Sequence, residues 1–114
     1  MTDFETNWST QLRKGIYELC VLNALRNQRR YGYEIVQALG SIDSLVVSEG
    51  AIYPILNRLK TEELVTTYLE ESPGGPPRKY YELTKKGRRQ LDTMNGYWLD
   101  LIRSIENLRK ELSS

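Results

Sequence analysis

The chain has 114 residues, of which 39% are hydrophobic, 10% aromatic and 27% charged, which is typical of a folded domain and excludes a disordered chain. Sixteen Lys and Arg residues and fifteen Asp and Glu residues give a net charge of +1, which excludes a uniformly basic surface but not a local basic face. The chain has no His and one Cys, which excludes His-based catalysis, His metal ligands, an internal disulfide and a four-thiolate zinc site.

The first half of the chain contains three segments in which apolar residues recur at helical spacing. The first predicted helix spans residues 9–26 and carries Cys20 in an apolar run, where a thiol is most simply a small core residue. The second is short, opens at Tyr31 and ends at Gly40. The third follows Ser48, a favoured N-cap residue. Its core-facing stripe consists of Ile52, Ile55, Leu56 and Leu59.

The period of the pattern then changes from that of a helix to that of a strand. Apolar and polar residues alternate over residues 65–70, and residues 79–83 are predicted to form the return strand. Residues 73–77, Pro-Gly-Gly-Pro-Pro, lie between them and predict a tight, stiff loop. The segment is therefore a predicted β-hairpin.

Thr84 can cap a last helix that is predicted to reach about residue 112. Its apolar residues alternate between spacings of three and four, as in the seam of a coiled coil. These seam residues are Leu91, Met94, Trp98, Leu101, Ile105, Leu108 and Leu112. A small core cannot cover a stripe of about 30 Å, so we expect this seam to be the interface of a two-fold homodimer, to which Trp8 and Leu12 could add. The alternative is that the helix folds back onto its own domain.

The order of three helices, a hairpin and a long helix is that of a winged helix-turn-helix protein. The predicted fold class is mainly α with a small β-hairpin. Residues 1–84 are expected to form the winged helix-turn-helix domain, and residues 85–114 the C-terminal dimerisation helix.

A winged helix binds double-stranded DNA by placing its third helix in the major groove and its wing on the backbone or in the adjacent minor groove. On the outer face of the predicted third helix, Asn57 can pair with adenine, and Arg58 can reach guanine or phosphate. Residues 78–89 contain six cations and one anion, a local charge of +5 (6 − 1). The candidate DNA-binding residues are Tyr17, Tyr33, Ser48, Gly50, Tyr53, Asn57, Arg58, Arg78 and Lys79. The alternative is a solvated surface on which Glu70 and Glu71 pair with part of the basic cluster.

Three stretches resemble the PadR family of bacterial transcriptional regulators. They are Gly-Tyr-Glu-Ile at 32–35, Ser-Glu-Gly-Ala-Ile-Tyr-Pro-Ile-Leu-Asn-Arg-Leu at 48–59 and Gly-Gly-Pro-Pro-Arg-Lys-Tyr-Tyr-Glu-Leu-Thr at 74–84, with Gly87 following. The resemblance covers roughly residues 12–91, and the single C-terminal helix is similar to that of the short subgroup. The chain departs from the family's pattern at Glu63, where the family usually turns with Gly.

The resemblance implies a homodimeric repressor that binds a palindromic operator and releases it when an effector binds. Family effectors include phenolic acids and, in the short subgroup, flat hydrophobic drugs held between the two chains. Trp98 matches the aromatic residue that lines the dimer cavity in that subgroup, with Met94, Leu101 and Trp8 as neighbours. The alternative for Trp98 is plain packing in the dimer interface.

Two other functional classes compete with a repressor. A winged-helix module that binds an acidic protein instead of DNA would use the same basic cluster. An enzyme is disfavoured, since the chain has no His, no glycine-rich phosphate loop and no acid pair placed in a cleft. We expect no metal ion and no cofactor. The short apolar runs and the acidic N-terminus predict no membrane span and no signal peptide, and hence a cytoplasmic protein.

Overall fold

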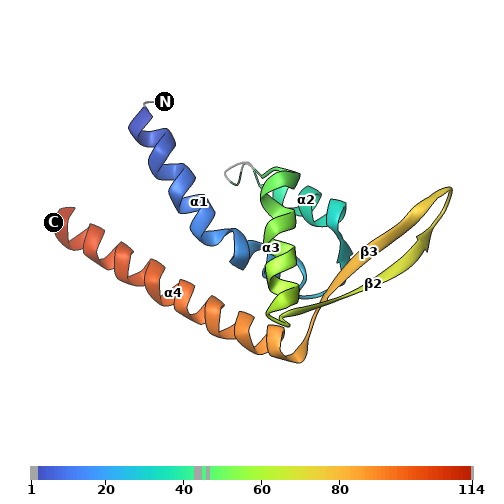
Figure 1. The fold of residues 1–114 in the computed structure, drawn as a ribbon. Coiled ribbons are helices and arrows are strands. Elements are labelled where there is room, and N and C mark those ends of the chain that lie inside the picture. The colour runs from blue at the N-terminus through green and yellow to red at the C-terminus, as the bar shows by residue number, and fades with distance from the viewer. Residues whose placement is uncertain (1–2, 43–44, 46, 114) are drawn as a thin grey trace.

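The structure is a computed structural model that describes residues 3–42, 45 and 47–113 (Figure 1). Its elements are α1 (Asp3–Ala24), β1 (Arg30–Tyr31), α2 (Gly32–Gly40), α3 (Glu49–Thr61), β2 (Val65–Ser72), β3 (Gly75–Leu83) and α4 (Lys85–Ser113). The three strands form one antiparallel sheet in the order β1-β3-β2. The predicted fold class, mainly helical with a small hairpin and a long C-terminal helix, is confirmed.

Two side-chain caps hold helices α3 and α4 at their starts. Ser48 Oγ accepts a hydrogen bond from the backbone N–H of Ala51 at 3.3 Å. Thr84 Oγ1 accepts one from the backbone N–H of Gly87 at 2.9 Å and donates one to the carbonyl of Glu63 at 2.7 Å. Each cap satisfies an N–H group that has no partner within its helix, so both sequence-predicted caps are confirmed.

The end of α3 is a Schellman motif at Glu63, whose φ is 62°. The N–H of Leu64 donates to the carbonyl of Leu59 at 2.9 Å, and the N–H of Glu63 donates to the carbonyl of Lys60 at 3.0 Å. The side chains of Leu59 and Leu64 are both buried in the core. The turn therefore has the geometry that Gly normally supplies, and Glu63 adopts it at a cost of about 1 kcal/mol.

Helix α1 starts earlier than the sequence predicts, at Asp3 rather than near residue 9. Trp8 and Leu12 therefore both lie inside it, and both are exposed. The prediction missed this first part because residues 3–8 carry no core-facing apolar stripe from which a helix could be recognised.

The sheet has one strand more than the predicted hairpin. Strand β1 contains two residues, Arg30 and Tyr31, and pairs with β3. So short a strand has no alternation of its own and is defined by this pairing. The turn between β2 and β3 is also shorter than the predicted loop of residues 73–77, because β3 already begins at Gly75.

The hydrophobic core lies among α1, α2, α3, the base of the sheet and the first turns of α4. Its buried residues are Val21, Leu22, Leu25, Ile35, Leu39, Leu45, Ile52, Leu56, Leu59, Leu64, Val65, Tyr81, Leu83 and Leu91. Leu91 is 1% exposed, so the prediction that it forms part of a dimer interface is wrong: its own chain encloses it. The core of the predicted 1–84 domain thus extends into the helix of residues 85–114.

Helix α4 begins in close contact with the segment that joins α3 to β2. Gly87 is buried, and a Cβ atom on it would lie 2.0 Å from the carbonyl oxygen of Leu64. A residue without a side chain is required for this approach. The contact fixes the point from which α4 leaves the core.

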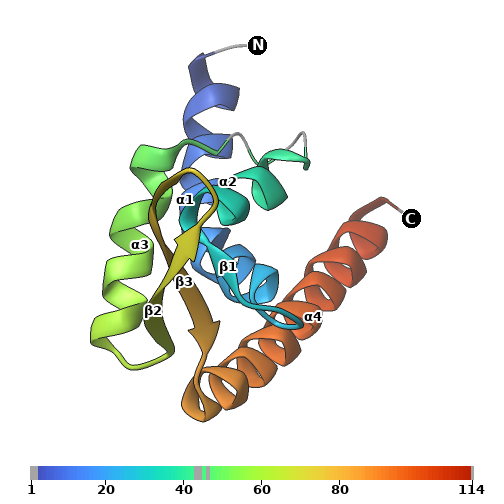
Figure 2. The same ribbon diagram turned by 90° about the vertical axis from the view of Figure 1, so that its right-hand side faces the viewer.

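Beyond its first turns, α4 extends away from the body of the molecule (Figures 1 and 2). The molecule measures 59 × 34 × 21 Å and has a radius of gyration of 16.6 Å. A compact chain of this length would have a radius of gyration of about 13 Å. Within the described residues, none of the helices combines the length and apolar character needed to cross a bilayer.

Candidate nucleic-acid interface and apolar grooves

The outer surface of α3 and the wing, which is the β2–β3 hairpin, meet at a hollow of about 280 Å³. Its lining residues are Tyr31, Gly32, Tyr53, Asn57, Arg78, Lys79 and Tyr81. The structure thus brings together four predicted DNA-binding residues, Tyr53 and Asn57 of α3 and Arg78 and Lys79 of β3. Two cations, an amide and phenol hydroxyls are hydrogen-bond donors of the kind that contact phosphate oxygens and base edges.

Close packing shapes this hollow from α2. A Cβ atom on Gly32 would lie 2.6 Å from the hydroxyl oxygen of Tyr53, so Gly32 leaves room for that ring. Burial, and secondly the electrostatic effect of Tyr53, raises the pKa of Tyr81 above its usual value. The Tyr81 hydroxyl therefore stays protonated at neutral pH and can donate a hydrogen bond.

The other predicted DNA-binding residues lie outside the hollow. Ser48 and Gly50 are exposed at the N-terminal end of α3, and Tyr33 is exposed on α2. The Arg58 guanidinium forms an ion pair with Glu18 of α1 at 2.8 Å.

Tyr17 is the one candidate whose position argues against a DNA contact. Its side chain is 8% exposed and lies among the buried hydrophobic residues of the chain. So little of the side chain is accessible that the structure disfavours a phosphate contact by Tyr17.

The cations at the start of α4 bind backbone carbonyls of other elements. Lys86 Nζ donates to the carbonyl of Glu62 at 3.0 Å, and the Arg88 guanidinium donates to that of Arg26 at 3.1 Å. Both carbonyls lie just beyond the C-terminal ends of helices α3 and α1, where helix dipoles favour positive charge. These contacts explain why two cations occupy a helix N-terminus, which otherwise disfavours them.

A tyrosine row crosses the face of the sheet opposite to the core. The rings of Tyr31, Tyr80 and Tyr68 follow one another across β1, β3 and β2, with centroids 5.6 and 5.9 Å apart. The Arg29 guanidinium lies over two of them, 4.6 Å from the Tyr80 centroid and 5.3 Å from the Tyr68 centroid. It also bonds Glu70 at 2.6 Å and the Tyr68 hydroxyl at 2.7 Å. These hydrogen bonds, that to Glu70 foremost, raise the pKa of Arg29.

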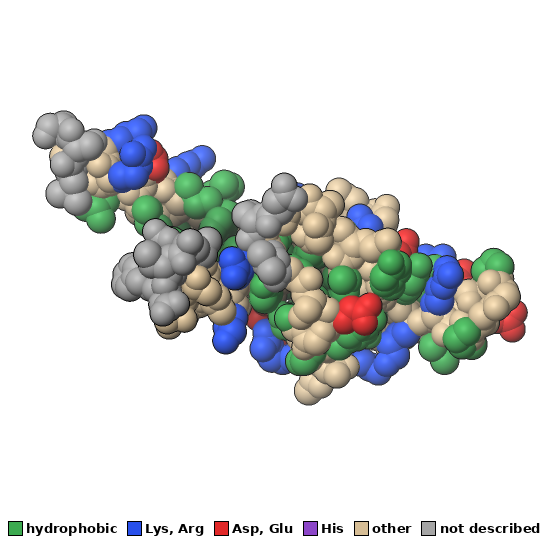
Figure 3. Space-filling view, turned by 90° about the horizontal axis from the view of Figure 1, so that it is seen from above, with side chains coloured by type: hydrophobic (Ala, Val, Ile, Leu, Met, Phe, Trp, Pro, Cys, Tyr) green, Lys and Arg blue, Asp and Glu red, His purple; other side chains and the backbone are tan. Residues whose placement is uncertain are grey.

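The apolar side chains of α4 beyond the core are exposed. They are Tyr97, Leu99, Leu101, Ile102, Ile105 and Leu108. Met94 and Trp98 are half-buried, and the side chain of Leu112 lies outside the part that the structure describes. In Figure 3, hydrophobic side chains gather along the α4 arm at the left, and Lys and Arg side chains lie both near the end of that arm and toward the wing at the right.

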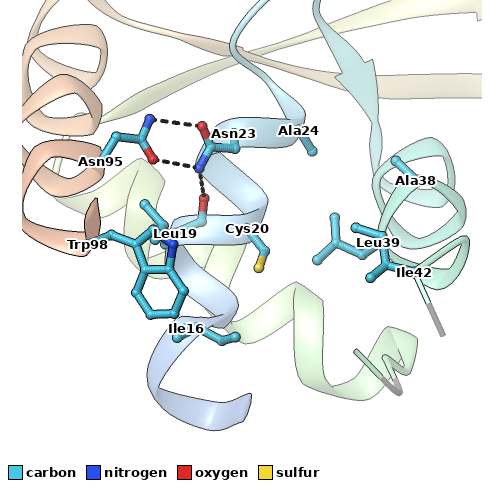
Figure 4. Close-up of a pocket in the computed structure, with 10 residues that line it drawn as sticks. All are labelled: Ile16, Leu19, Cys20, Asn23, Ala24, Ala38, Leu39, Ile42, Asn95 and Trp98. Atoms are coloured by element: carbon cyan, nitrogen blue, oxygen red, sulfur yellow. Dashed lines mark hydrogen bonds between the residues drawn. The ribbon is translucent and has the colours of Figure 1, made fainter. Parts of the chain in front are cut away.

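Two apolar grooves flank Trp98. One, of about 440 Å³, lies among α1, α2 and α4 and is lined by Ile16, Leu19, Cys20, Asn23, Ala24, Ala38, Leu39, Ile42, Asn95 and Trp98 (Figure 4). The other, of about 540 Å³, lies between α1 and α4 and is lined by Gln11, Leu12, Gly15, Ile16, Leu19, Thr93, Met94, Tyr97, Trp98 and Leu101. The structure therefore brings Trp98, Met94 and Leu101 together as predicted. Trp8 lines neither groove and is 59% exposed.

An amide pair closes one end of the first groove. Asn23 Nδ2 donates to Asn95 Oδ1 and Asn95 Nδ2 donates to Asn23 Oδ1, each at 3.0 Å (Figure 4). Burial raises the pKa of the Cys20 thiol on the same wall, so the thiol stays protonated and acts as an apolar lining residue. The sequence prediction missed both Asn residues because it followed apolar positions alone. The three-residue spacing between Asn95 and Trp98 places them on one helix face and was the available signal.

Comparison with known families matches residues 21–93, nearly two thirds of the chain, to the transcriptional regulator PadR-like family. The match runs from the core end of α1 through the wing into the first turns of α4. The chain belongs to the PadR family of transcriptional regulators. All three stretches that carry the resemblance to PadR proteins, together with Gly87, lie inside the matched region.

Solved PadR structures share the fold over most of its length. A PadR-like transcriptional regulator of Bacillus cereus is 39% identical, with a TM-score of 0.78 over 86% of this chain and 95% of that chain. A PadR family regulator of Eggerthella lenta is 29% identical, with a TM-score of 0.82 over 93% of this chain and 92% of that chain. Bacillus subtilis PadR, solved in complex with operator DNA, is 25% identical, with a TM-score of 0.62 over 69% of this chain and 46% of that chain.

Proposed function

We propose that this PadR-family regulator is a homodimeric repressor that binds a palindromic operator and is released by a small hydrophobic or aromatic effector. The observation that carries the proposal is the separation of two surfaces on one chain. Hydrogen-bond donors and cations surround the hollow between α3 and the wing, and exposed apolar side chains cover the outer part of α4. The first surface suits DNA, and the second suits another copy of the chain. The protein would act in the cytoplasm on DNA, without a catalytic residue or a cofactor.

For DNA binding, the outer surface of α3 would enter the major groove and the wing would lie on the backbone. Asn57 would read adenine, and Tyr53, Arg78 and Lys79, which line the same hollow, would contact phosphates. Arg58 would have to leave Glu18 to take part, since the two form an ion pair in the free chain. The operator complex of Bacillus subtilis PadR supports this mode for a relative of the same fold.

For dimer formation, the outer part of α4 would pack against its copy across a two-fold axis. The exposed seam residues Leu101, Ile105 and Leu108 need such a cover, and the extended shape of the single chain supports it. A two-fold dimer of this kind would present two α3 helices about 34 Å apart, one turn of B-DNA.

For effector binding, Trp98 is the centre of the proposed site because it lines both apolar grooves. Its indole would stack on a flat aromatic molecule, with Met94 and Leu101 beside it. An effector that fits one spacing of the two DNA-binding units better than another would shift the dimer away from the operator.

Titration of the chain with duplex DNA from upstream of its own gene, at several salt concentrations, tests DNA binding. We expect tighter binding than to shuffled DNA and an affinity that falls steadily with salt. Replacing Arg78 and Lys79 together by Ala should weaken binding about tenfold or more. The control replaces Arg103 and Lys110 together, which removes the same charge from the far face of α4 and should change little.

Three results would count against this proposal. The first two are no preference over shuffled DNA and an affinity that does not depend on salt. The third is unchanged DNA binding in the variant that lacks Arg78 and Lys79, which would favour a winged-helix module that binds a protein instead.

Tryptophan fluorescence tests the effector site, because the chain has two Trp residues and Trp8→Phe leaves Trp98 as the only source of tryptophan emission. Planar phenolic acids and flat hydrophobic dyes are expected to quench this emission and to release the operator over the same concentration range. Quenching without any loss of DNA binding would contradict an effector role for the grooves.

A further inference from the structure

The anion Glu70 lies directly across the hairpin from the cation Arg78. The register of β2 and β3 pairs these two residues, so their side chains start from neighbouring positions on one face of the wing. Opposite charges at such positions normally attract each other. In this chain they do not pair: Glu70 bonds Arg29 at 2.6 Å, and the Arg78 guanidinium lies 4.7 Å from the centroid of the Tyr31 ring.

Several contacts hold the Arg29 guanidinium beside Glu70. Its guanidinium bonds Glu70 with two nitrogens, at 2.6 and 3.4 Å, and donates to the Tyr68 hydroxyl at 2.7 Å. The same planar group lies over the rings of Tyr68 and Tyr80. A guanidinium can bond a carboxylate in its plane and stack on aromatic rings at its face simultaneously, which a lysine ammonium cannot do.

We propose that Arg29 is a positioning residue for DNA binding: it holds Glu70 away from Arg78 and so leaves Arg78 available to a DNA phosphate. The proposal rests on the proposed DNA-binding function. Arg78 lines the hollow between α3 and the wing, whereas Glu70 does not. Were Arg29 absent, Glu70 would turn to its cross-strand neighbour, and the wing would lose one positive contact without losing Arg78 itself.

A set of single and double variants tests this role through operator affinity and its dependence on salt. Arg29→Ala is expected to weaken binding roughly 5- to 10-fold and to lower the salt slope by about one for each wing, since one phosphate contact is lost. Adding Glu70→Gln to Arg29→Ala should restore the affinity and the slope to near their original values, because the competing charge is gone. Adding Glu71→Gln instead, a matched control that removes a neighbouring acid, should not restore the slope.

Variants made in Arg78→Ala protein show whether Arg29 acts by positioning Glu70 or by contacting DNA itself. In Arg78→Ala protein, the further change Arg29→Ala should have little effect on DNA affinity, because there is no Arg78 left to protect. If Arg29 itself touched DNA, its removal would weaken binding equally in both backgrounds. Arg29→Lys should resemble Arg29→Ala although it keeps the charge.

The outcomes are distinct. Failure of the unmodified chain to bind DNA overturns the proposed function. DNA binding by the unmodified chain, without rescue of Arg29→Ala by Glu70→Gln, overturns the positioning role alone. Thermal unfolding confirms that each variant is folded, and Arg29→Gln, which keeps a hydrogen-bond donor, replaces Arg29→Ala if that variant does not fold.

Discussion

The two halves of α4 share one heptad pattern but have different surroundings. In the first half, Leu91 is 1% exposed and packs against helices and strands of its own chain. In the second half, Ile105 occupies the equivalent position two heptads later and Leu108 the next seam position, and each is 56% exposed. One end of this continuous seam therefore completes the core of the domain, and the other end is exposed and is the surface proposed to meet a second copy.

The largest effect is expected on dimer formation, from a substitution in the outer half of α4. Ile105→Glu places a carboxylate at the proposed two-fold seam, where the copy brings a second one. We expect the dissociation constant of the dimer, measured by sedimentation equilibrium, to rise more than about 100-fold. Asn107→Glu adds the same charge on an exposed position away from the seam and should leave the dimer intact. A dimer that survives Ile105→Glu would show that the outer half is not the interface.

Substitutions in the inner half of α4 should destabilise the fold, as substitutions in a hydrophobic core do. Leu91→Ala is expected to lower the free energy of unfolding by about 3 kcal/mol, since it removes a fully buried side chain and leaves a cavity. Urea unfolding at one fixed protein concentration measures this change, with exposed Leu99→Ala as a reference that should cost much less. A loss below about 1 kcal/mol would mean that Leu91 is not part of the folded core.

Replacing two glycines of α4 by Ala should change stability by less than Leu91→Ala does, and in opposite directions. A methyl group on Gly87 would meet the Leu64 carbonyl, so Gly87→Ala is expected to cost about 2 kcal/mol of unfolding free energy. At Gly96 nothing lies within 4 Å of an added Cβ, and Gly96→Ala should stabilise the helix by up to about 1 kcal/mol. Equal effects in urea unfolding would contradict the close approach at the base of α4.

The smallest change in stability is expected at Glu63, just after the end of α3. Glu63→Gly should raise the free energy of unfolding by about 1 kcal/mol, because glycine adopts the left-handed conformation at this position without steric cost. Glu62→Gly is the control: Glu62 has negative φ, so the same replacement there should not stabilise. A destabilised Glu63→Gly protein would show that the Glu63 side chain contributes more than the turn costs.

Most helices and the hairpin could be predicted from the sequence because each carries its own periodic pattern and cap. Ser48 and Thr84 mark the starts of α3 and α4, and their side chains make the expected bonds. Strand β1 could not be predicted, since two residues have no period and are defined by pairing with β3. The heptad spacing predicts the wrong surface for Leu91, because spacing along a helix does not reveal which neighbour covers each turn.

The candidate site was predictable only in part, because local patterns do not reveal pairs of residues that lie far apart in the sequence. Asn57 and Tyr53 follow from the outward face of one helix, and the basic residues of the wing from local charge. The pairs Arg29 with Glu70 and Arg58 with Glu18 join residues about 40 positions apart, and many other partners were open to each charge. Which partner is taken depends on the register of the sheet and on the packing of α1 against α3.

The contact of Gly87 with Leu64 also has a mechanical consequence. Helix α4 has 29 residues and, at 1.5 Å per residue, is about 43 Å long, so a rotation about this contact would move its far end most. A rotation of about 5° there would displace the far end by roughly 4 Å on this length. In a dimer joined through the far ends of two such helices, small changes in packing beside Trp98 would be magnified into the distance between the two DNA-reading helices. In the proposed dimer, the close approach of Gly87 to Leu64 would therefore govern how far a change in one groove moves the DNA-reading helices.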